Sequence, residues 1–310
     1  MLFLDEEQVR RHLRMEELIP AMEKALVDFS AGKVIQPVRS VITVDPPGGF
    51  LGLMPALAEG LGVKFVTFYP SNTERDIPTH MATIFLVDPE TGTPLSVMDG
   101  RLITEMRTAA VSALATKLLT SPDSRVLAIL GSGVQARSHV EALRLVRNFE
   151  QIRVWSRTPA HAERFAEEID AKAMPAQAAV RDADVVVTVT SSKTPVLKGS
   201  WLKSGCHVNA VGACRPDWRE LDDEAMANVV FVDSRQGAMK ESGDVILSGA
   251  KIYAELGEAL AGKVPARANE TTVFKSLGMA VEDIAAALLV YRLIGKRKNS
   301  EESGKTRKDS

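Results

Sequence analysis

Short apolar runs alternate with helical segments from residue 125 onward. The run at 125–130 is aliphatic and ends at a glycine, which is typical of a strand covered on both faces. A helix is expected at 160–169. Further runs of the strand type occupy 151–155, 183–190, 207–212 and 229–233. Because strands that alternate with helices require right-handed crossovers, this region predicts a doubly wound, mostly parallel sheet of the α/β class.

The first third of the chain has a different pattern that is rich in strands. A short strand is expected at 1–4, and an amphipathic helix at 16–30 has apolar residues at helical spacing. Extended segments separated by turn residues occupy 34–44, 50–55, 62–69, 79–88 and 94–99. A helix at 104–119 leads into the parallel sheet, and an apolar helix at 276–294 comes last. We therefore expect a strand-rich α+β module beside the α/β one.

Composition agrees with a two-domain globular protein. The chain has 310 residues, of which 45% are hydrophobic and 25% charged, and this length exceeds what one core usually organises. The net charge of −2 gives no electrostatic case for nucleic acid or a membrane surface as partner. The polar tail at 296–310 cannot bury a core and is expected to be disordered.

Cysteine use and the amino terminus point to a reducing compartment. Cys206 and Cys214 are too few for a disulfide framework, and neither a Cys-x-x-Cys pair nor a metal-spaced His pair occurs, so no metal is expected. Residues 1–14 mix charged and apolar side chains and do not resemble a signal peptide. The apolar run at 285–294 is too short to span a bilayer. We expect a cytoplasmic protein.

A glycine turn comes directly after the strand at 125–130. Gly131, Gly133 and Ala136 form a G-x-G-x-x-A pattern where the next helix should begin. Gly131 permits the tight turn, Gly133 lets the backbone approach a pyrophosphate, and Ala136 allows the helix to pack close to the strand. The helix amides would then face the phosphates. An ordinary surface turn is the alternative, but strand, turn and helix occur in the order that a dinucleotide site requires.

The end of the next strand indicates which nicotinamide cofactor fits. An NAD enzyme would have Asp or Glu there for the ribose hydroxyls, whereas this chain has Ser156, Arg157 and Thr158. Arg157 could contact a 2′-phosphate with both arms of its guanidinium, and the two hydroxyls could donate to the same group. This favours NADPH, with NADH weaker. The alternative is an arginine that merely solvates a helix start.

Polar residues in the strand-rich module are the candidates for substrate contacts: Arg39, Lys64, His80 and Arg107. Lys64 lies between apolar residues, so alternation slightly favours an outward side chain; a buried cation there would need an anionic partner. For Arg107, which is on an alanine-rich helix, a structural salt bridge is the alternative to a site role. Arg39 and Lys64 together would make a clamp for a carboxylate.

Asp217 is the candidate proton donor. It comes after the strand at 207–212, and ligands bind outside the carboxyl ends of strands in open α/β sheets. A carboxyl group partly buried beside Trp218 could have a raised pKa and act as an acid. The alternative is a helix cap for the residues from Trp218 onward.

The motifs together resemble the ornithine cyclodeaminase and mu-crystallin family. They are QPVRS, LGLMPA, KFVTFYP, PTHMAT, TEMRTAAVSALATK, LGSGVQARSH, NAVGACRPDWREL, KESGDV and VFKSLGMAVED, and they span residues 1 to about 294. The match is closest to the mu-crystallin branch of NADPH-dependent ketimine reductases. The resemblance implies a homodimer. It implies a substrate-binding and dimerisation domain at 1–120, completed by a helix at 279–295, and an NADPH-binding Rossmann domain at 121–278.

The resemblance also implies roles for individual residues. Arg39 would hold the substrate carboxylate, Lys64 and Arg107 would line the same pocket, and Asp217 would stand near the imine nitrogen. Glu241 would lie at the pocket for substrate or thyroid hormone. The implied cofactor contacts are His80, Arg107, Thr108, Gly131, Gly133, Val134, Gln135, Ser156, Arg157, Thr158, Thr190 and Ser276.

The expected activity is NADPH-dependent reduction of a cyclic ketimine carboxylate. Two other functions stay open. One is an ornithine cyclodeaminase that recycles NAD, against which the lack of an acidic residue at 156–158 argues. The other is a carrier or lens crystallin that binds NADPH and a thyroid hormone such as triiodothyronine without turnover.

Overall fold

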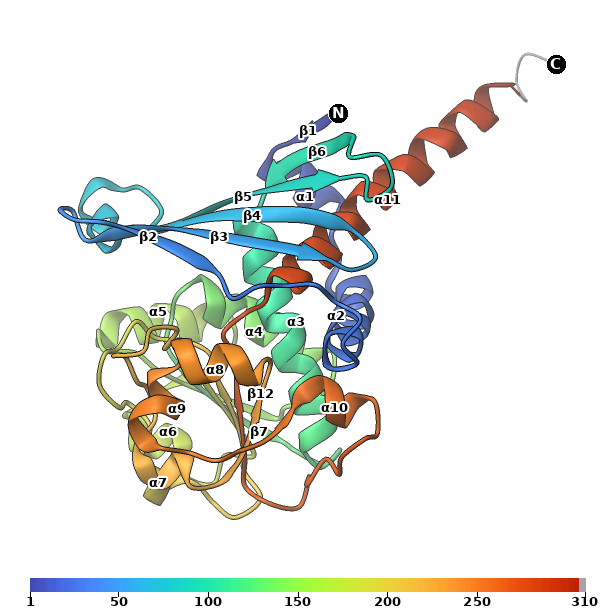
Figure 1. Ribbon diagram of the computed structural model, residues 1–310. Coiled ribbons are helices and arrows are strands. Elements are labelled where there is room, and N and C mark those ends of the chain that lie inside the picture. The colour runs from blue at the N-terminus through green and yellow to red at the C-terminus, as the bar shows by residue number, and fades with distance from the viewer. Residues whose placement is uncertain (307–310) are drawn as a thin grey trace. The chain divides into compact units, whose positions relative to one another are not determined.

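The computed structural model describes residues 1–306, with side chains to residue 295. The chain divides into two compact units (Figure 1). The first, here called the sheet unit, contains Met1–Ala25, Gly32–Arg107 and the segment from Ala280 onward. The second, the nucleotide unit, contains Leu26–Ala31 and Thr108–Met279. Two helices contribute to both units: α2 (Met15–Ser30) and α3 (Arg101–Leu119).

The nucleotide unit is built on an eight-stranded sheet in the order β13-β12-β14-β11-β10-β7-β8-β9. All strand pairs described in this sheet are parallel. The order reverses between β7 and β10, which is the switch point of a doubly wound sheet, so the predicted α/β Rossmann class is confirmed. The strands are β7 (Val126–Leu130), β8 (Gln151–Trp155), β9 (Lys172–Ala173), β10 (Val185–Thr188), β11 (His207–Ala210), β12 (Val229–Val232), β13 (Ile252–Glu255) and β14 (Thr272–Lys275).

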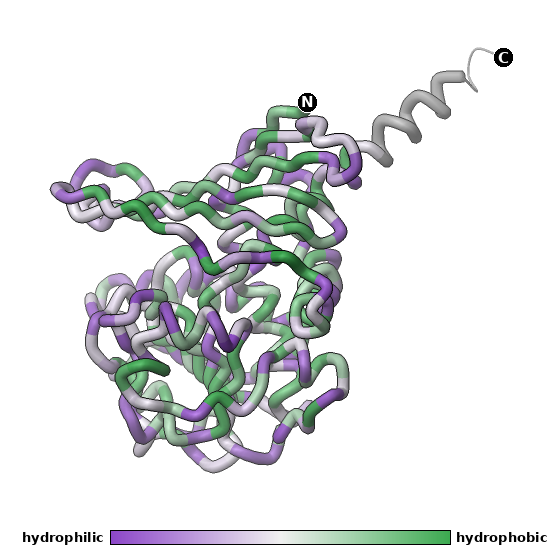
Figure 2. The backbone as a smooth tube through the Cα atoms, viewed as in Figure 1, coloured by the Kyte–Doolittle hydropathy of each residue, from purple (hydrophilic) through white to green (hydrophobic). Residues whose placement is uncertain are grey.

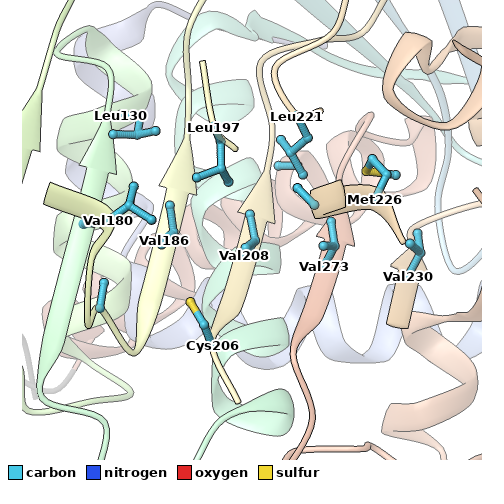
Figure 3. Packing of buried hydrophobic residues seen from close by; sticks show 14 of the residues in the cluster. Leu130, Val180, Val186, Leu197, Cys206, Val208, Leu221, Met226, Val230 and Val273 are labelled. Carbon is cyan, nitrogen blue, oxygen red and sulfur yellow. The ribbon is translucent and has the colours of Figure 1, made fainter. Parts of the chain in front are cut away.

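Helices and aliphatic side chains cover this sheet. Val186, Val208 and Val273 lie next to one another across neighbouring strands and contact a layer that includes Leu197 and Leu221 (Figure 3). Each of these side chains is fully buried, as the continuous aliphatic strands predict for a sheet covered on both faces. The helical elements are α4 (Val134–Arg144), α5 (Pro159–Glu168), α6 (Ala176–Val180), η2 (Gly199–Trp201), α7 (Asp223–Met226), α8 (Arg235–Glu241), α9 (Gly243–Ser248) and α10 (Leu256–Leu260).

The sheet unit contains a six-stranded sheet in the order β1-β6-β5-β4-β3-β2. Only β1 and β6 pair in parallel among these strands; the other pairs are antiparallel. The strands are β1 (Leu2–Leu4), β2 (Ser40–Val44), β3 (Gly49–Leu57), β4 (Leu61–Phe68), β5 (His80–Val87) and β6 (Pro94–Asp99). The other elements are α1 (Glu6–His12), η1 (Pro70–Arg75) and α11 (Ala280–Thr306).

Helix α11 covers one face of this sheet and contacts β3, β4 and β5 (Figure 1). Gly62 makes the close approach possible, because a Cβ there would lie 2.8 Å from Cδ1 of Ile284. The strand register places Lys64 beside Met54 and Ile84 on this covered face. Figure 2 shows that hydrophobic stretches also run along the strands of the sheet unit. By the same register, Phe65 lies on the opposite face of the sheet, and its side chain is 44% exposed.

Several element predictions need correction. The helix expected at 276–294 begins at Ala280, because residues 276–279 form the connection from a strand at Thr272–Lys275 that the pattern did not predict. Strand β13 and the 3-10 helix η1 were also missed. The disordered tail predicted at 296–310 falls on residues 307–310, which lie outside the described residues, and on 296–306, whose backbone continues α11. That prediction and the domain boundaries stay untested.

Within the described part of the chain, no helix has the length and apolar character needed to cross a bilayer. The same residues contain no group of three or more His, Cys, Asp or Glu side chains arranged to hold a metal ion. Both cysteines are free, and burial raises the pKa of the Cys206 thiol to about 12. Cys214 is exposed.

Candidate functional site

The turn after β7 has the geometry that its glycines predict. Gly131 adopts a φ of 135°, in the region that glycine alone tolerates well, and its N–H donates to the carbonyl of Trp155 at 2.8 Å. A Cβ at this position would lie 2.7 Å from the carbonyl oxygen of Val189. The turn therefore packs directly against the strand end after β10, at the switch point of the sheet.

Gly133 is the N-cap of α4 and differs from Gly131 in its surroundings. Apart from its neighbours in the chain and the start of α4, none of the described residues has a heavy atom within 4 Å of a Cβ built on Gly133, so the space in front of the helix start is open. The first amides of a helix have no intrahelical acceptors and attract anions. Ala136 is fully buried, which confirms the close packing predicted for the third position of the motif. This turn has the geometry of a phosphate-binding glycine turn.

Arg137 stabilises the glycine turn through its side chain. This role was not predicted from the sequence. Its Nη1 donates to the carbonyl of Ser132 at 2.9 Å, and its guanidinium forms an ion pair with Glu168 at 2.5 Å. The same guanidinium lies 4.9 Å from the ring centroid of Phe165. Arg137 thus ties the glycine turn to α5. In the sequence, Arg137 comes directly after Ala136, the last position of the glycine motif. A search for that motif does not single out the arginine.

The residues after β8 lie where a ribose phosphate would be recognised. The hydroxyls of Ser132 and Ser156 are 3.0 Å apart, which joins the glycine turn to the end of β8. Arg157 is exposed directly after that, and Thr158 is the N-cap of α5. The exposure of Arg157 is compatible with contact to a phosphate and with simple solvation, so both interpretations stay open.

Among the buried polar atoms of the nucleotide unit that have no hydrogen-bond partner in the described part of the chain, two lie near the carboxyl ends of the strands. They are Oε1 of Gln135, in the first turn of α4, and Oγ of Ser276, directly after β14. Buried polar atoms are normally paired, so unpaired ones beside the carboxyl ends of the strands suit a bound ligand. Thr190 is partly buried after β10. Together with the glycine turn, these groups fit a nicotinamide dinucleotide.

The sheet unit holds a second group of candidates, centred on Lys64. The outward orientation favoured for Lys64 by its pattern is wrong: the residue is 1% exposed and its Nζ lies 2.6 Å from Oδ2 of Asp283. The strand does alternate, but its apolar neighbours face away from α11 and the lysine faces towards it. The alternation of residue types along the strand showed that the two faces of the sheet differ. It could not show which face another element covers.

Arg107 completes this cluster. It is 4% exposed, and its Nε and Nη1 lie 2.9 Å from Oδ1 of Asp283 and 2.8 Å from Oε2 of Glu282. The salt bridge considered for Arg107 therefore exists. Glu282 and Asp283 were not predicted as site residues; the available signal was a pair of acids at the start of an otherwise apolar helix.

Burial and charge together set the protonation of this cluster. Burial lowers the pKa of Lys64 to about 8, with Asp283 opposing that shift and Arg107 and Arg39 adding to it. Burial, followed by the charges of Lys64 and Arg107, lowers the pKa of His80 to about 4. Burial would raise the pKa of Asp283, but the charges of Arg107 and Lys64 outweigh it and lower that pKa. At neutral pH, Lys64 is a cation and His80 is uncharged.

Arg39 lies in the segment before β2 and is partly exposed. Its charge acts on Lys64, so the two predicted clamp residues are electrostatic neighbours within the sheet unit. Lys64 and Arg107 are buried, whereas Arg39 is partly exposed, so Arg39 is more accessible to solvent than these two cations. A carboxylate would meet it first.

Asp217 differs from its prediction. It is exposed, so the expected partial burial beside Trp218 is wrong, and no helix begins there, so the helix-cap alternative is wrong as well. It lies instead on a loop that continues from β11. Glu241 is the last residue of α8 and is partly exposed, and Thr108 is buried in α3.

The glycine turn at the switch point and the polar groups around it define a class, the dinucleotide-binding α/β proteins. Comparisons with known proteins narrow it. The family described as the ornithine cyclodeaminase/mu-crystallin family matches residues 1–298. The ketimine reductase mu-crystallin of Mus musculus is 53% identical over 300 residues, covering 93% of this chain and 96% of the relative. This chain belongs to the ornithine cyclodeaminase/mu-crystallin family.

More distant relatives share the same architecture. A Δ1-pyrroline-2-carboxylate reductase of Bacillus cereus is 36% identical, covering 94% of this chain and 96% of the relative. The structure of the Thermococcus litoralis Δ1-pyrroline-2-carboxylate reductase with NADH and L-proline superposes with a TM-score of 0.92 at 37% identity, covering 96% and 98% of the two chains. An archaeal alanine dehydrogenase dimer with bound NAD gives a TM-score of 0.92 at 33% identity, covering 96% and 97%.

Proposed function

We propose that this chain reduces the C=N bond of a cyclic ketimine that has a carboxylate, with NADPH as the reductant. The observation that carries the proposal is a buried group of cations, Lys64 and Arg107 with Arg39 beside them, in a chain that also has a dinucleotide-binding turn. The relatives named as ketimine and pyrroline-2-carboxylate reductases support the same reaction class. The chain is therefore an oxidoreductase that acts on C=N with a nicotinamide cofactor.

Reduction of an imine adds a hydride to carbon and a proton to nitrogen, and a bound nicotinamide would supply the hydride. The chain's own residues do the rest. Arg39 would orient the carboxylate through a charge-assisted hydrogen bond. Lys64 and Arg107, whose charges Asp283 and Glu282 balance, would line the same site. Asp217 is the proposed proton donor to nitrogen. Lys64 is a second proton source, since its pKa of about 8 leaves an ammonium at neutral pH.

NADPH is the proposed cofactor because of the three residues directly after β8. Ser156, Arg157 and Thr158 offer two hydroxyls and a cation, with no carboxylate among the three to repel a 2′-phosphate. NADH should also bind, more weakly, because the glycine turn at Gly133 serves both cofactors. A relative binds NADH and another binds NAD. The choice between the cofactors therefore depends on the segment after β8.

A thyroid hormone such as triiodothyronine is a proposed second ligand. Its amino-acid end has a carboxylate, which the cations Arg39 and Lys64 would accept as they accept the substrate carboxylate. Reduction and hormone binding would then compete. Glu241, in the nucleotide unit, is a further proposed contact for the hormone.

A homodimer is the proposed assembly. Phe3, Phe65 and Met81 project from the face of the sheet that α11 does not cover, and they are 68%, 44% and 39% exposed. The register aligns further apolar residues with them, namely Leu53, Val63, Phe85 and Val97. A sheet face with several exposed apolar side chains is typical of an interface between protein chains. A second copy of the same sheet would cover it.

The test of the proposed activity is NADPH oxidation with a cyclic ketimine carboxylate, run beside NADH and beside added triiodothyronine. We expect turnover with NADPH, slower turnover with NADH, and suppression by the hormone. Ammonia release from ornithine is measured in parallel, because it would indicate a cyclodeaminase. Binding of NADPH without oxidation would overturn the reductase proposal and favour a carrier.

A further inference from the structure

Glu220 is a fully buried carboxylate in the nucleotide unit with no role in the proposed reaction. It lies between two loops at the carboxyl edge of the sheet. The first, here called the Thr190 loop, is residues 189–195 after β10, and the second, the Asp217 loop, is residues 213–219 after β11. Each loop contains a proposed site residue. A group that fixes both loops would set the geometry of both residues.

One oxygen of Glu220 holds the Thr190 loop. Oε1 accepts a hydrogen bond from the backbone N–H of Thr190 at 2.7 Å and another from its hydroxyl at 2.6 Å. The hydroxyl of Thr190 in turn accepts from the N–H of Ser192 at 3.1 Å. The backbone and the side chain of Thr190 are therefore both oriented by this carboxylate.

The other oxygen closes the Asp217 loop. Oε2 accepts from the N–H of Gly212 at 2.7 Å, so the residues on either side of the loop, Gly212 and Glu220, are joined directly. The hydroxyl of Thr188 donates to the same oxygen at 2.8 Å. Gly212 has no room for a side chain, because a Cβ there would lie 2.1 Å from the carbonyl oxygen of Thr190. The Thr190 loop therefore packs closely against Gly212, the residue directly before the Asp217 loop.

Further contacts hold this arrangement. The N–H of Glu220 donates to Oδ1 of Asp244 at 2.7 Å, and Oδ2 of Asp244 lies 3.0 Å from Nζ of Lys275; all three residues are fully buried. The Nζ of Lys193 lies 5.4 Å from the ring centroid of Trp218, which is a second link between the loops. A carboxylate that accepts four hydrogen bonds, two of them from backbone N–H groups, has no freedom to turn.

From these contacts we infer that Glu220 is a positioning residue, which fixes Thr190 and the Asp217 loop together at the carboxyl edge of the sheet. This inference rests on the proposed function, because Thr190 and Asp217 have site roles only there. Glu220 itself is placed for neither proton transfer nor cofactor contact. It acts through the two loops.

Glu220→Gln is the sharpest variant. The side chain keeps its shape, but its NH₂ group must face either the N–H of Thr190 or the N–H of Gly212, and a donor facing a donor releases that loop. The matched control is Asp184→Asn. Asp184 accepts from the N–H groups of Arg125 and Val126 at 2.7 Å each, at the opposite, amino edge of the same sheet.

Two readouts test the inference in the full-length protein. Amide hydrogen exchange without cofactor should be faster in the Thr190 loop, the Asp217 loop or both for Glu220→Gln, and unchanged there for Asp184→Asn. With NADPH and a ketimine, kcat should fall about tenfold or more for Glu220→Gln, because small displacements of site groups are costly, and the Kd for NADPH should rise as well where the Thr190 loop is the one released. Asp184→Asn should keep its kcat.

The inference would be overturned if amide hydrogen exchange in the two loops of Glu220→Gln were no faster than in Asp184→Asn. A kcat of Glu220→Gln equal to that of Asp184→Asn would overturn it as well. If Glu220→Gln does not fold, Thr188→Val replaces it, since this change removes one hydrogen-bond donor to Glu220 and alters neither loop. Thr188→Val should lower kcat by a smaller factor than Glu220→Gln. An unchanged kcat would count against the inference. If the wild type reduces no ketimine, the proposed function fails, and the exchange comparison still decides whether Glu220 holds the loops.

Discussion

Lys64 shows how a single side chain in this protein depends on its partner. A buried ammonium is costly without a counter-ion, and Asp283 supplies one at 2.6 Å. Asp283 also contacts Arg107, so one carboxylate serves two cations. Removing one partner of such a buried pair typically costs about 3–5 kcal/mol, because the other charge is left uncompensated. Asp283 is thus the residue on which the charge state of the cluster depends.

Replacing Asp283 should change the pH dependence of turnover. If the ammonium of Lys64 is required, kcat/KM falls as pH rises through the pKa of Lys64, about 8. Asp283 raises that pKa, so Asp283→Asn should move the falling limb to lower pH. The measurement is kcat/KM against pH. Glu59→Gln, which alters an exposed ion pair with Arg292, is the control and should leave the limb in place. An unshifted limb in Asp283→Asn would exclude Lys64 as the titrating group.

Arg157→Ala should affect NADPH more than NADH. A hydrogen bond to a charged group contributes about 1.5–3 kcal/mol, which corresponds to a rise of roughly tenfold to a hundredfold in the KM for NADPH. The KM for NADH should hardly change, because NADH has no 2′-phosphate. Steady-state kinetics with both cofactors measure this. Arg164→Ala, which removes an exposed arginine within α5, is the control. Equal losses for the two cofactors would show that Arg157 does not contact the phosphate.

At the scale of the element, the turn between β7 and α4 contains two glycines. One is needed for steric reasons and the other leaves space for a ligand. Gly131 needs its positive φ and has the backbone of Val189 against it, whereas Gly133 has ordinary backbone angles and open space. Both glycines were predicted from one motif, but the structure shows that glycine is needed at the two positions for different reasons. Strain explains the first, and room for a ligand explains the second.

Alanine substitutions should separate these two reasons. Gly131→Ala should lower the free energy of unfolding by about 1–3 kcal/mol, because the backbone is strained and the Cβ meets Val189. Gly133→Ala should leave stability nearly unchanged and weaken NADPH binding, because its Cβ would occupy the approach to the pyrophosphate. Urea denaturation and fluorescence titration with NADPH measure the two effects. The opposite pattern, a stable Gly131→Ala or a Gly133→Ala that binds normally, would contradict this division.

At the scale of the whole molecule, the open face of the sheet in the sheet unit is the feature that a single chain leaves unexplained. Its strands alternate a covered set that includes Lys64 with an exposed set that includes Phe65. Exposing so much apolar surface is unfavourable in water, and association removes it. Residues of these strands alternate between the two faces of the sheet, and this alternation led to the wrong orientation for Lys64. The pattern is explained if α11 covers one face and, in the proposed dimer, a second chain covers the other.

A charge on the open face should therefore prevent the proposed dimer. Phe65→Asp places a carboxylate in the middle of the apolar face and should give a monomer in analytical ultracentrifugation. Met239→Asp is the control: Met239 is also exposed, at 61%, but belongs to α8 in the nucleotide unit, so this variant should sediment as the wild type does. A dimer that survives Phe65→Asp would require a different interface.

The sequence by itself determined the features that neighbouring residues decide. Aliphatic runs between helices predicted β7, β8, β10, β11 and β12, and the glycine turn predicted the helix that begins at Val134, because periodicity and turn sterics act over a few residues. Strands β13 and β14 were missed, since a four-residue strand such as Thr272–Lys275 gives little periodicity to detect.

Only the tertiary structure decided which groups meet. Arg107 and Asp283 are 176 residues apart in the chain, and no local pattern links them. The same holds for Glu220, whose donors come from β10, the Thr190 loop and Gly212, and for Asp217, whose exposure depends on how its loop folds. The free energy of a buried charge depends on all the atoms around it. The sequence therefore specified the elements, and the packing of those elements specified the chemistry of the sites.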